Sequence, residues 1–170
     1  RGSSPAAADF NGDGIWDVIN AYWGNSAGPW GTNAVLRGLG GGRFELDLTS
    51  PLAMTHTWVE GWGWADWNSD GWPDLYGATT GSANQVDLMF QNLGGGGFVS
   101  VTNAPMVEVR DFSWIPACAD YDNDGELDLA VTSLNHTNFL YRNFGGGAFE
   151  PDPASPKYPV GGTPIAGVWG

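Results

Sequence analysis

The sequence predicts an all-β protein built from β-propeller-type blades, each a sheet of four antiparallel strands. Three observations predict this fold class. An acidic segment occurs three times, a glycine-rich segment follows each copy, and the residues around both are rich in β-forming side chains. No segment has the period of an amphipathic helix. Units of four short strands at this spacing are typical of β-propeller blades.

The acidic segment has the frame A-D-aromatic-[ND]-x-D-G-x-x-D. Its copies are ADFNGDGIWDVINA at 8–21, ADWNSDGWPDLYGA at 65–78 and ADYDNDGELDLAVT at 119–132. The first aspartates are Asp9, Asp66 and Asp120, so the repeat lengths are 57 and 54 residues. Repetition at this length, with two motifs in register, indicates consecutive copies of one structural unit.

Strands are expected on both sides of each acidic segment. Residues 17–23, 74–80 and 128–134 follow the acidic segments, and residues 3–9, 57–64 and 109–118 precede them. The glycine-rich segments are VLRGLGGGRFE at 35–45, MFQNLGGGGFVS at 89–100 and LYRNFGGGAFE at 140–150, and they predict hairpins. Each unit therefore has about four strands, and the acidic loop joins the first strand to the second.

These units predict a single repeat domain over residues 1–170. The approximate repeats are 1–50, 51–104 and 105–161, and residues 162–170 resemble the first strand of a further blade. Three blades are too few for a closed ring, which usually has about 4–8. The chain is therefore expected to be an open arc, a fragment of a longer protein or a unit completed by another chain, and the fragment is favoured.

Charge and composition exclude several classes of partner and setting. The chain has 19 acidic and 6 basic residues and a net charge of −13, which excludes nucleic acid as a partner. It has no apolar run long enough to span a membrane and no visible signal peptide. Cys118 is the only cysteine, so no intrachain disulfide can form, and a buried, inert thiol is expected.

The acidic segments predict three calcium sites. Positions 1, 3, 5 and 9 of the frame carry side-chain oxygens, position 6 is always glycine, and position 7 can add a backbone carbonyl. Such an all-oxygen, carboxylate-rich set suits Ca²⁺ far better than zinc or copper. The expected side-chain ligands are Asp9, Asn11, Asp13 and Asp17, then Asp66, Asn68, Asp70 and Asp74, then Asp120, Asp122, Asp124 and Asp128. The expected carbonyl ligands belong to Ile15, Trp72 and Glu126.

Two other interpretations of the acidic segments are disfavoured. Asp, Asn and Gly are good turn residues, but three copies with every ligand position intact are improbable as simple turns. An EF-hand needs a glutamate at position 12, where this chain has Asn20, Gly77 and Val131.

The loops resemble the calcium loops of FG-GAP/VCBS repeats, which are the blades of integrin-α-like β-propellers. Segments such as LYRNFGGGAFE, with GVWG at 167–170, are most similar to the bacterial and cartilage-acidic-protein branch. The first glycine-rich segment is a weaker copy, with Gly38 where the others have Asn92 and Asn143. The resemblance implies structural calcium and an extracellular location, either secreted or at the cell surface. It implies no single activity, because one fold supports many functions.

The sequence favours a non-enzymatic binding, adhesion or assembly module whose ligand is a protein or glycan at the cell surface. One alternative is a carbohydrate-active protein, either a lectin or a propeller resembling polysaccharide lyases. A second is a filament subunit joined by exchange of the strand at 163–170. No catalytic residue is identified, and an enzyme is less expected than a binding module. His56 and His136 fall in predicted loops, and Asn135 begins a glycosylation sequon.

Five tryptophans lie in HTWVEGWGWADWNSDGWPDLYGA, residues 56–78. Trp67 aligns with Phe10 and Tyr121 at position 2 of the other acidic segments. Trp64 aligns with Cys118 and Trp169 at the end of the first strand. We therefore expect both tryptophans to pack inside the blades. Trp58, Trp62 and Trp72 have no aromatic counterparts. These three are the candidates for a ligand-binding surface.

Overall fold

The structure is a computed structural model that describes residues 2–22, 33–55, 57–80, 85–134 and 138–153. The predicted strand at 162–170 lies outside the described residues, as do His56, Asn135 and His136. Within the described ranges, no helix has the length and apolar character needed to cross a membrane.

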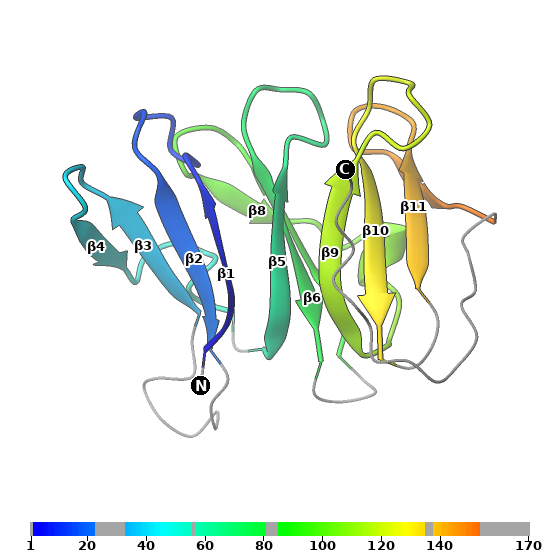
Figure 1. Cartoon of the computed structure of the whole chain (residues 1–170), viewed down its shortest axis with the longest axis horizontal. Helices are drawn as coiled ribbons and strands as arrows, with labels where there is room; N and C mark the ends of the chain where they lie inside the picture. The colour runs from blue at the N-terminus through cyan, green and yellow to red at the C-terminus, as the bar shows by residue number, and fades with distance from the viewer. Residues whose placement is uncertain (1, 23–32, 56, 81–84, 135–137, 154–170) are drawn as a thin grey trace.

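The described chain forms three four-stranded antiparallel sheets that stand side by side (Figure 1). The first sheet comprises β1 (Gly2–Ala8), β2 (Asp17–Tyr22), β3 (Ala34–Gly38) and β4 (Phe44–Asp47). The second comprises β5 (Val59–Ala65), β6 (Asp74–Thr79), β7 (Leu88–Asn92) and β8 (Phe98–Ser100). The third comprises β9 (Ser113–Ala119), β10 (Asp128–Ser133), β11 (Phe139–Asn143) and β12 (Phe149–Pro151), after a 3₁₀ turn at Pro105–Val107. These blade-like sheets in an open arrangement confirm the predicted fold class.

Each sheet follows chain order, because every connection within it joins neighbouring antiparallel strands. The acidic segments lie between the first and second strands, and the glycine-rich segments form the hairpins between the third and fourth. In the second sheet, Leu93 N–H donates to Gly97 O at 2.7 Å and closes the hairpin. Three successive glycines there, Gly94 to Gly96, have φ of 92°, 61° and 79°. Only glycine adopts this conformation without strain, which explains the triplet.

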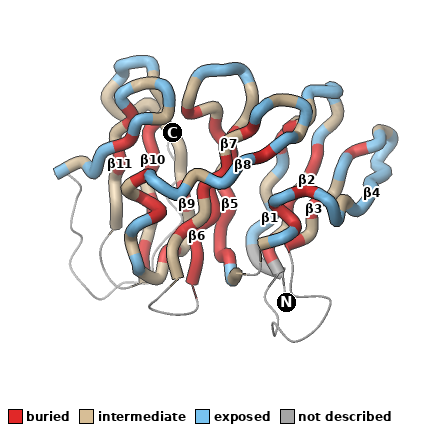
Figure 2. The backbone as a smooth tube through the Cα atoms, turned by 180° about the vertical axis from the view of Figure 1, so that it is seen from behind, coloured by how far each residue is buried: buried red, intermediate tan, exposed pale blue. Residues whose placement is uncertain are grey.

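The hydrophobic core lies between the sheets. The cluster between the first and second sheets contains Phe10, Ile19, Ala21, Val35, Leu52, Ala53, Val59, Trp62, Leu75, Phe90 and Phe98. The cluster between the second and third sheets contains Ala65, Trp67, Tyr76, Ala78, Met89, Ala104, Met106, Val107, Leu129, Val131, Tyr141 and Phe149. Because the second sheet is covered on both faces, β6 is buried along its whole length, whereas β4 is largely exposed (Figure 2).

The aligned aromatic residues contribute to this packing as expected. Trp67 is fully buried, and Trp64 is half-buried and stacks on Phe10 of the first sheet with ring centroids 5.7 Å apart. Cys118 lies on β9, and burial raises the pKa of its thiol to about 12. The thiol therefore stays protonated at neutral pH and is a poor nucleophile.

A buried carboxylate links the second and third sheets. Asp87 accepts hydrogen bonds from the Tyr76 hydroxyl at 2.5 Å, from Thr79 N–H at 2.7 Å and from the Ser113 hydroxyl of β9 at 2.6 Å. Burial raises the pKa of Asp87, although these donors act in the opposite direction. The bond from Ser113 fixes the start of β9 against the second sheet.

Buried asparagines form a second link between sheets. The Asn92 amide donates to Phe10 O of the first sheet at 2.8 Å, and the Asn143 amide donates to Trp67 O of the second sheet at 2.8 Å. Each amide therefore satisfies a carbonyl in the acidic loop of the preceding sheet. The sequence showed these asparagines as repeated residues, but their role depends on the neighbouring sheet.

Replacing Asn143 with alanine should destabilise the fold by about 1–3 kcal/mol, because it leaves the buried carbonyl of Trp67 without its donor. Urea unfolding would measure the loss as a lower midpoint. Asn103→Ala is the matched control, since Asn103 is exposed and the same change there should cost less than about 0.5 kcal/mol. Equal losses in the two variants would contradict the role of Asn143.

Candidate metal centre

The three acidic loops share one pattern of hydrogen bonds. In the first loop, Asp9 at position 1 accepts Asp13 N–H at 3.1 Å and Gly14 N–H at 2.8 Å. Asn11 at position 3 accepts Asp13 N–H at 2.9 Å, and Asp13 at position 5 accepts Ile15 N–H at 2.8 Å. The corresponding bonds form in the loops at 66–74 and 120–128. The backbone thus wraps around oxygen-bearing side chains at alternate positions.

Two left-handed residues produce this wrapping. The position 6 glycines Gly14, Gly71 and Gly125 have φ of 82°, 90° and 94°. Position 4 is also left-handed, with φ of 74° at Gly12, 59° at Ser69 and 62° at Asn123. Non-glycine residues seldom adopt positive φ, so the second and third loops hold these residues in place through their hydrogen bonds.

The aspartate at position 9 anchors each loop to its sheet. Asp74 is buried and accepts Trp67 N–H at 3.3 Å and Asn92 N–H at 2.8 Å, which ties the loop to the end of β7. Asp17 and Asp128 make the equivalent pairs of bonds. Burial raises the pKa of all three carboxyls, that of Asp74 to about 6. A carboxylate oxygen that accepts one N–H keeps a second lone pair, which could still bind a cation. The ligand role of position 9 therefore stays a prediction.

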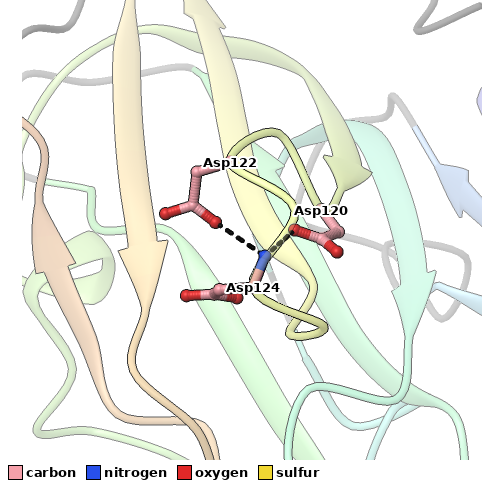
Figure 3. Close-up of side chains that lie close together, drawn as sticks. All are labelled: Asp120, Asp122 and Asp124. Carbon is pink, nitrogen blue, oxygen red and sulfur yellow. Dashed lines mark hydrogen bonds between the residues drawn. The ribbon is translucent and has the colours of Figure 1, made fainter.

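The third loop brings three carboxylates together (Figure 3). Asp120, Asp122 and Asp124 each offer an oxygen within 4.8 Å of the others. Figure 3 shows two of these carboxylates turned toward the Asp124 N–H, which donates to Asp120 at 3.0 Å and to Asp122 at 3.3 Å. The first two loops have Asn11 and Asn68 where the third has Asp122. The amide oxygen is an equivalent ligand for a hard cation and carries no charge.

The extra carboxylate of the third loop has a basic partner. Arg142 on β11 lies 2.7 Å from Asp122 Oδ2 and 2.9 Å from Asp124 Oδ2. The hydrogen bond from Arg142 to Asp124 lowers the pKa of Asp124, which is exposed. The same strand position holds Gln91 in the second sheet and Arg37 in the first, where Arg37 instead pairs with Glu45 and Asp47 at 3.8 and 3.5 Å. The sequence contained this difference, but only the fold places Arg142 beside the loop.

The donor set in the loops fits a hard divalent cation. The donors are carboxylate and amide oxygens on neighbouring turns of a tight backbone, and the third loop concentrates negative charge in a small volume. If calcium binds, the side chains at positions 1, 3 and 5 are the residues placed to hold it. The carbonyls of Ile15, Trp72 and Glu126 stay predicted ligands.

The position 7 side chains connect neighbouring loops. The Trp72 ring lies so close to Gly12 of the preceding loop that a Cβ there would be 2.5 Å from it, and the same ring contacts Gly94. In the next pair of loops, the Ser69 hydroxyl donates to the Glu126 carboxylate at 3.4 Å. Position 7 of one loop therefore contacts position 4 of the loop before it, a link the sequence did not reveal.

The structure separates the three tryptophans proposed as a ligand surface. Trp62 is 6% exposed and belongs to the core, so its assignment to a binding surface is wrong. Its ring packs over Gly77, where a side chain would collide with it. Trp72 is half-buried against two glycines, and Trp58 is 40% exposed. Of these three tryptophans, Trp58 is the most exposed.

Comparison with known protein families matches the repeat directly. The sequence profile of the FG-GAP-like repeat matches residues 9–77 and 66–131. Each match begins at the first aspartate of an acidic loop, Asp9 or Asp66, and together the matches span more than half of the chain. A comparison with curated proteins gave no match. The two profile matches and the repeated loop geometry show that the chain belongs to the FG-GAP-like repeat family.

Proposed function

We propose that this chain is a calcium-stabilised repeat scaffold that works outside the cell as a non-enzymatic binding, adhesion or assembly module. The observation that carries the proposal is an oxygen-lined loop that forms three times with the same hydrogen bonds. All three loops lie at the same end of the sheets (Figure 1). Membership of the FG-GAP-like family supports the same class of function.

Calcium has a clear physical task in this arrangement. Ten of the 19 acidic residues lie at the predicted side-chain ligand positions, and three bound Ca²⁺ would change the formal net charge from −13 to −7. The cation would relieve repulsion between carboxylates that the loop backbone forces together. Because the same loops carry the aromatic residues that pack between sheets, ordering a loop also stabilises the contact with the next sheet.

The ligand of the module is proposed to be a protein or a glycan at the cell surface. Trp58 is the aromatic candidate for a glycan contact, since Trp62 is buried and Trp72 packs between loops. A glycan array on the wild-type protein and a Trp58→Ala variant would detect a lectin. Release of unsaturated uronate from acidic polysaccharides would instead indicate a lyase.

Removal of calcium should lower the melting temperature. A ten-fold excess of calcium over its Kd stabilises the native state by about 1.4 kcal/mol per site, so three sites should raise Tm by about 10 °C. Differential scanning calorimetry in calcium and in EDTA would measure the shift, with excess magnesium as the control. An unchanged melting curve in EDTA would contradict the assignment of calcium to these loops.

Asp70→Ala should abolish one calcium site and leave two. Asp70 lies at position 5 of the second loop, and its carboxylate accepts Trp72 N–H at 2.9 Å without bonding to the other loops. Isothermal titration would report the stoichiometry falling from three to two. The matched control is Glu108→Gln, an exposed acid outside the loops, which should keep all three sites. Simultaneous loss of every site would show that the sites depend on global folding.

Arg142→Met should raise the calcium affinity of the third site about three- to ten-fold, because it removes a positive charge beside the ligands. Terbium luminescence, with calcium as competitor, would measure the affinity. Arg37→Met is the matched control, since Arg37 pairs with acids on β4 outside the first loop. A weaker third site in Arg142→Met would mean that the arginine orients the ligands and does not compete with the cation.

A further inference from the structure

A small cavity lies between the second and third sheets, beside the second acidic loop. Its volume is about 160 Å³. The second sheet contributes Met89 and Gln91, which point to the same face of β7, and Val101, which follows β8. The third sheet contributes Gly146 and Gly147 of its glycine-rich hairpin. The cavity therefore belongs to neither sheet alone and forms where the two meet.

The second acidic loop also lines the cavity, but its polar groups are already engaged. Trp67 and Asp74 are buried, and the two oxygens of Asp74 accept backbone N–H groups at 3.3 and 2.8 Å. The Asn68 amide donates to the Asp70 carboxylate at 2.9 Å and accepts Asp70 N–H at 3.1 Å. Hydrogen bonds to a ligand would therefore come mainly from the other walls of the cavity.

Gln91 supplies a hydrogen-bonding group that the protein does not use. Its side chain is half-buried, and within the described part of the chain its amide has no hydrogen-bond partner. A primary amide has two N–H donors and an acceptor oxygen. It can therefore bind two neighbouring hydroxyl groups at once, because it donates to one oxygen and accepts from the other.

The other sheets show why the cavity is present at this place. Gln91 and Val101 align with Arg37 and Asp47 of the first sheet, which form an ion pair at 3.5 Å. The third sheet has Arg142 at the position of Gln91, and Arg142 pairs with acids of its own loop. Only the second sheet thus combines an unpaired amide with a short apolar side chain at these positions. The cavity depends on residues that differ between the repeats.

Size and chemistry restrict the ligand to a small neutral ring. An apolar cavity of about 150 Å³ holds one benzene molecule, whereas pockets for drug-sized ligands have about 300–1,000 Å³. None of the described residues that line the cavity is basic, which disfavours an anion. A purely apolar ring would leave the Gln91 amide unsatisfied. A sugar ring meets both demands, because it presents C–H groups to Met89 and Val101 and hydroxyl groups to Gln91.

We propose that this cavity is a subsite for one neutral pyranose ring of a glycan, with Gln91 as the residue that binds its hydroxyl groups. The inference rests on the glycan form of the proposed function and gives that glycan a contact separate from Trp58. A glycan fits better than a protein partner does. Stable protein interfaces bury about 1,200–2,000 Å², whereas this cavity admits a single ring.

Nuclear magnetic resonance of the ¹⁵N-labelled protein in calcium-containing buffer would test the subsite. The probes are the methyl pyranosides of glucose, galactose, mannose and N-acetylglucosamine, with glucuronate as the acidic comparison. At least one neutral probe should shift the side-chain amide signals of Gln91 with a Kd of about 1–10 mM, as expected for so few atoms. Gln91 signals that no neutral probe shifts, or tighter binding of glucuronate, would overturn the proposal.

The ion pair of the first sheet provides a variant that should close the subsite. Gln91→Arg/Val101→Asp places the residues of the Arg37–Asp47 pair in the cavity and should weaken sugar binding at least about ten-fold. Gln91→Ala, the milder variant, should weaken it about three- to ten-fold. The control is Thr102→Asp, because Thr102 is exposed and does not line the cavity, so its Kd should equal that of the wild type. Circular dichroism would verify folding, and Gln91→Ala decides if the double variant unfolds.

Three outcomes would overturn the subsite and leave the broader proposed function standing. The first is sugar binding that survives Gln91→Ala but is lost in Trp58→Ala. The second is the absence of sugar binding in a protein whose Tm falls in EDTA. The third is a protein partner that shifts the Gln91 signals when no sugar does. An unchanged Tm in EDTA together with sugar binding at Gln91 would instead contradict the calcium scaffold and support the subsite.

Discussion

The buried aspartate at position 9 of each acidic loop is the interaction on which the rest of the structure depends. Its two oxygens accept one N–H from the start of the loop and one from the end of the third strand, as Asp74 does with Trp67 and Asn92. Burial opposes its negative charge and raises its pKa, and the backbone donors offset only part of that cost. The carboxylate thereby holds the loop, the second strand and the third strand in one arrangement, while the bonds to positions 1, 3 and 5 shape the loop itself.

This anchoring joins the acidic loops to the packing of the sheets. The residue whose N–H reaches the position 9 aspartate also carries the aromatic ring that enters the next sheet, and its carbonyl accepts the amide of Asn92 or Asn143. A displaced loop would therefore disturb the interface between sheets as well as the acidic cluster. If a cation binds the loops, its affinity and the stability of neighbouring sheets would be linked, because binding and folding would then depend on the same loop structure.

Local features of the fold could be predicted from the sequence, and contacts between sheets could not. The strands of the described residues, the acidic loops and the glycine hairpins follow from β-propensity and positive-φ requirements, which act over a few residues, and from repetition along the chain. Trp62 and Trp58 look alike in the sequence, yet Trp62 is buried and Trp58 is exposed, because the position of the neighbouring sheet determines which ring is covered. The hydrogen bond between Ser113 and Asp87 is another contact that the sequence does not reveal, because the two residues lie 26 positions apart and the bond joins the second and third sheets.

Repetition also sets a limit on what a single chain can bury. Each sheet has one face that receives the preceding loop and one that supports the following sheet, so the three described sheets cover one another at two interfaces. Phe44, Leu46 and Leu48 make the exposed side of the first sheet apolar. An apolar end favours another sheet over water as its neighbour, because burying apolar area lowers the free energy.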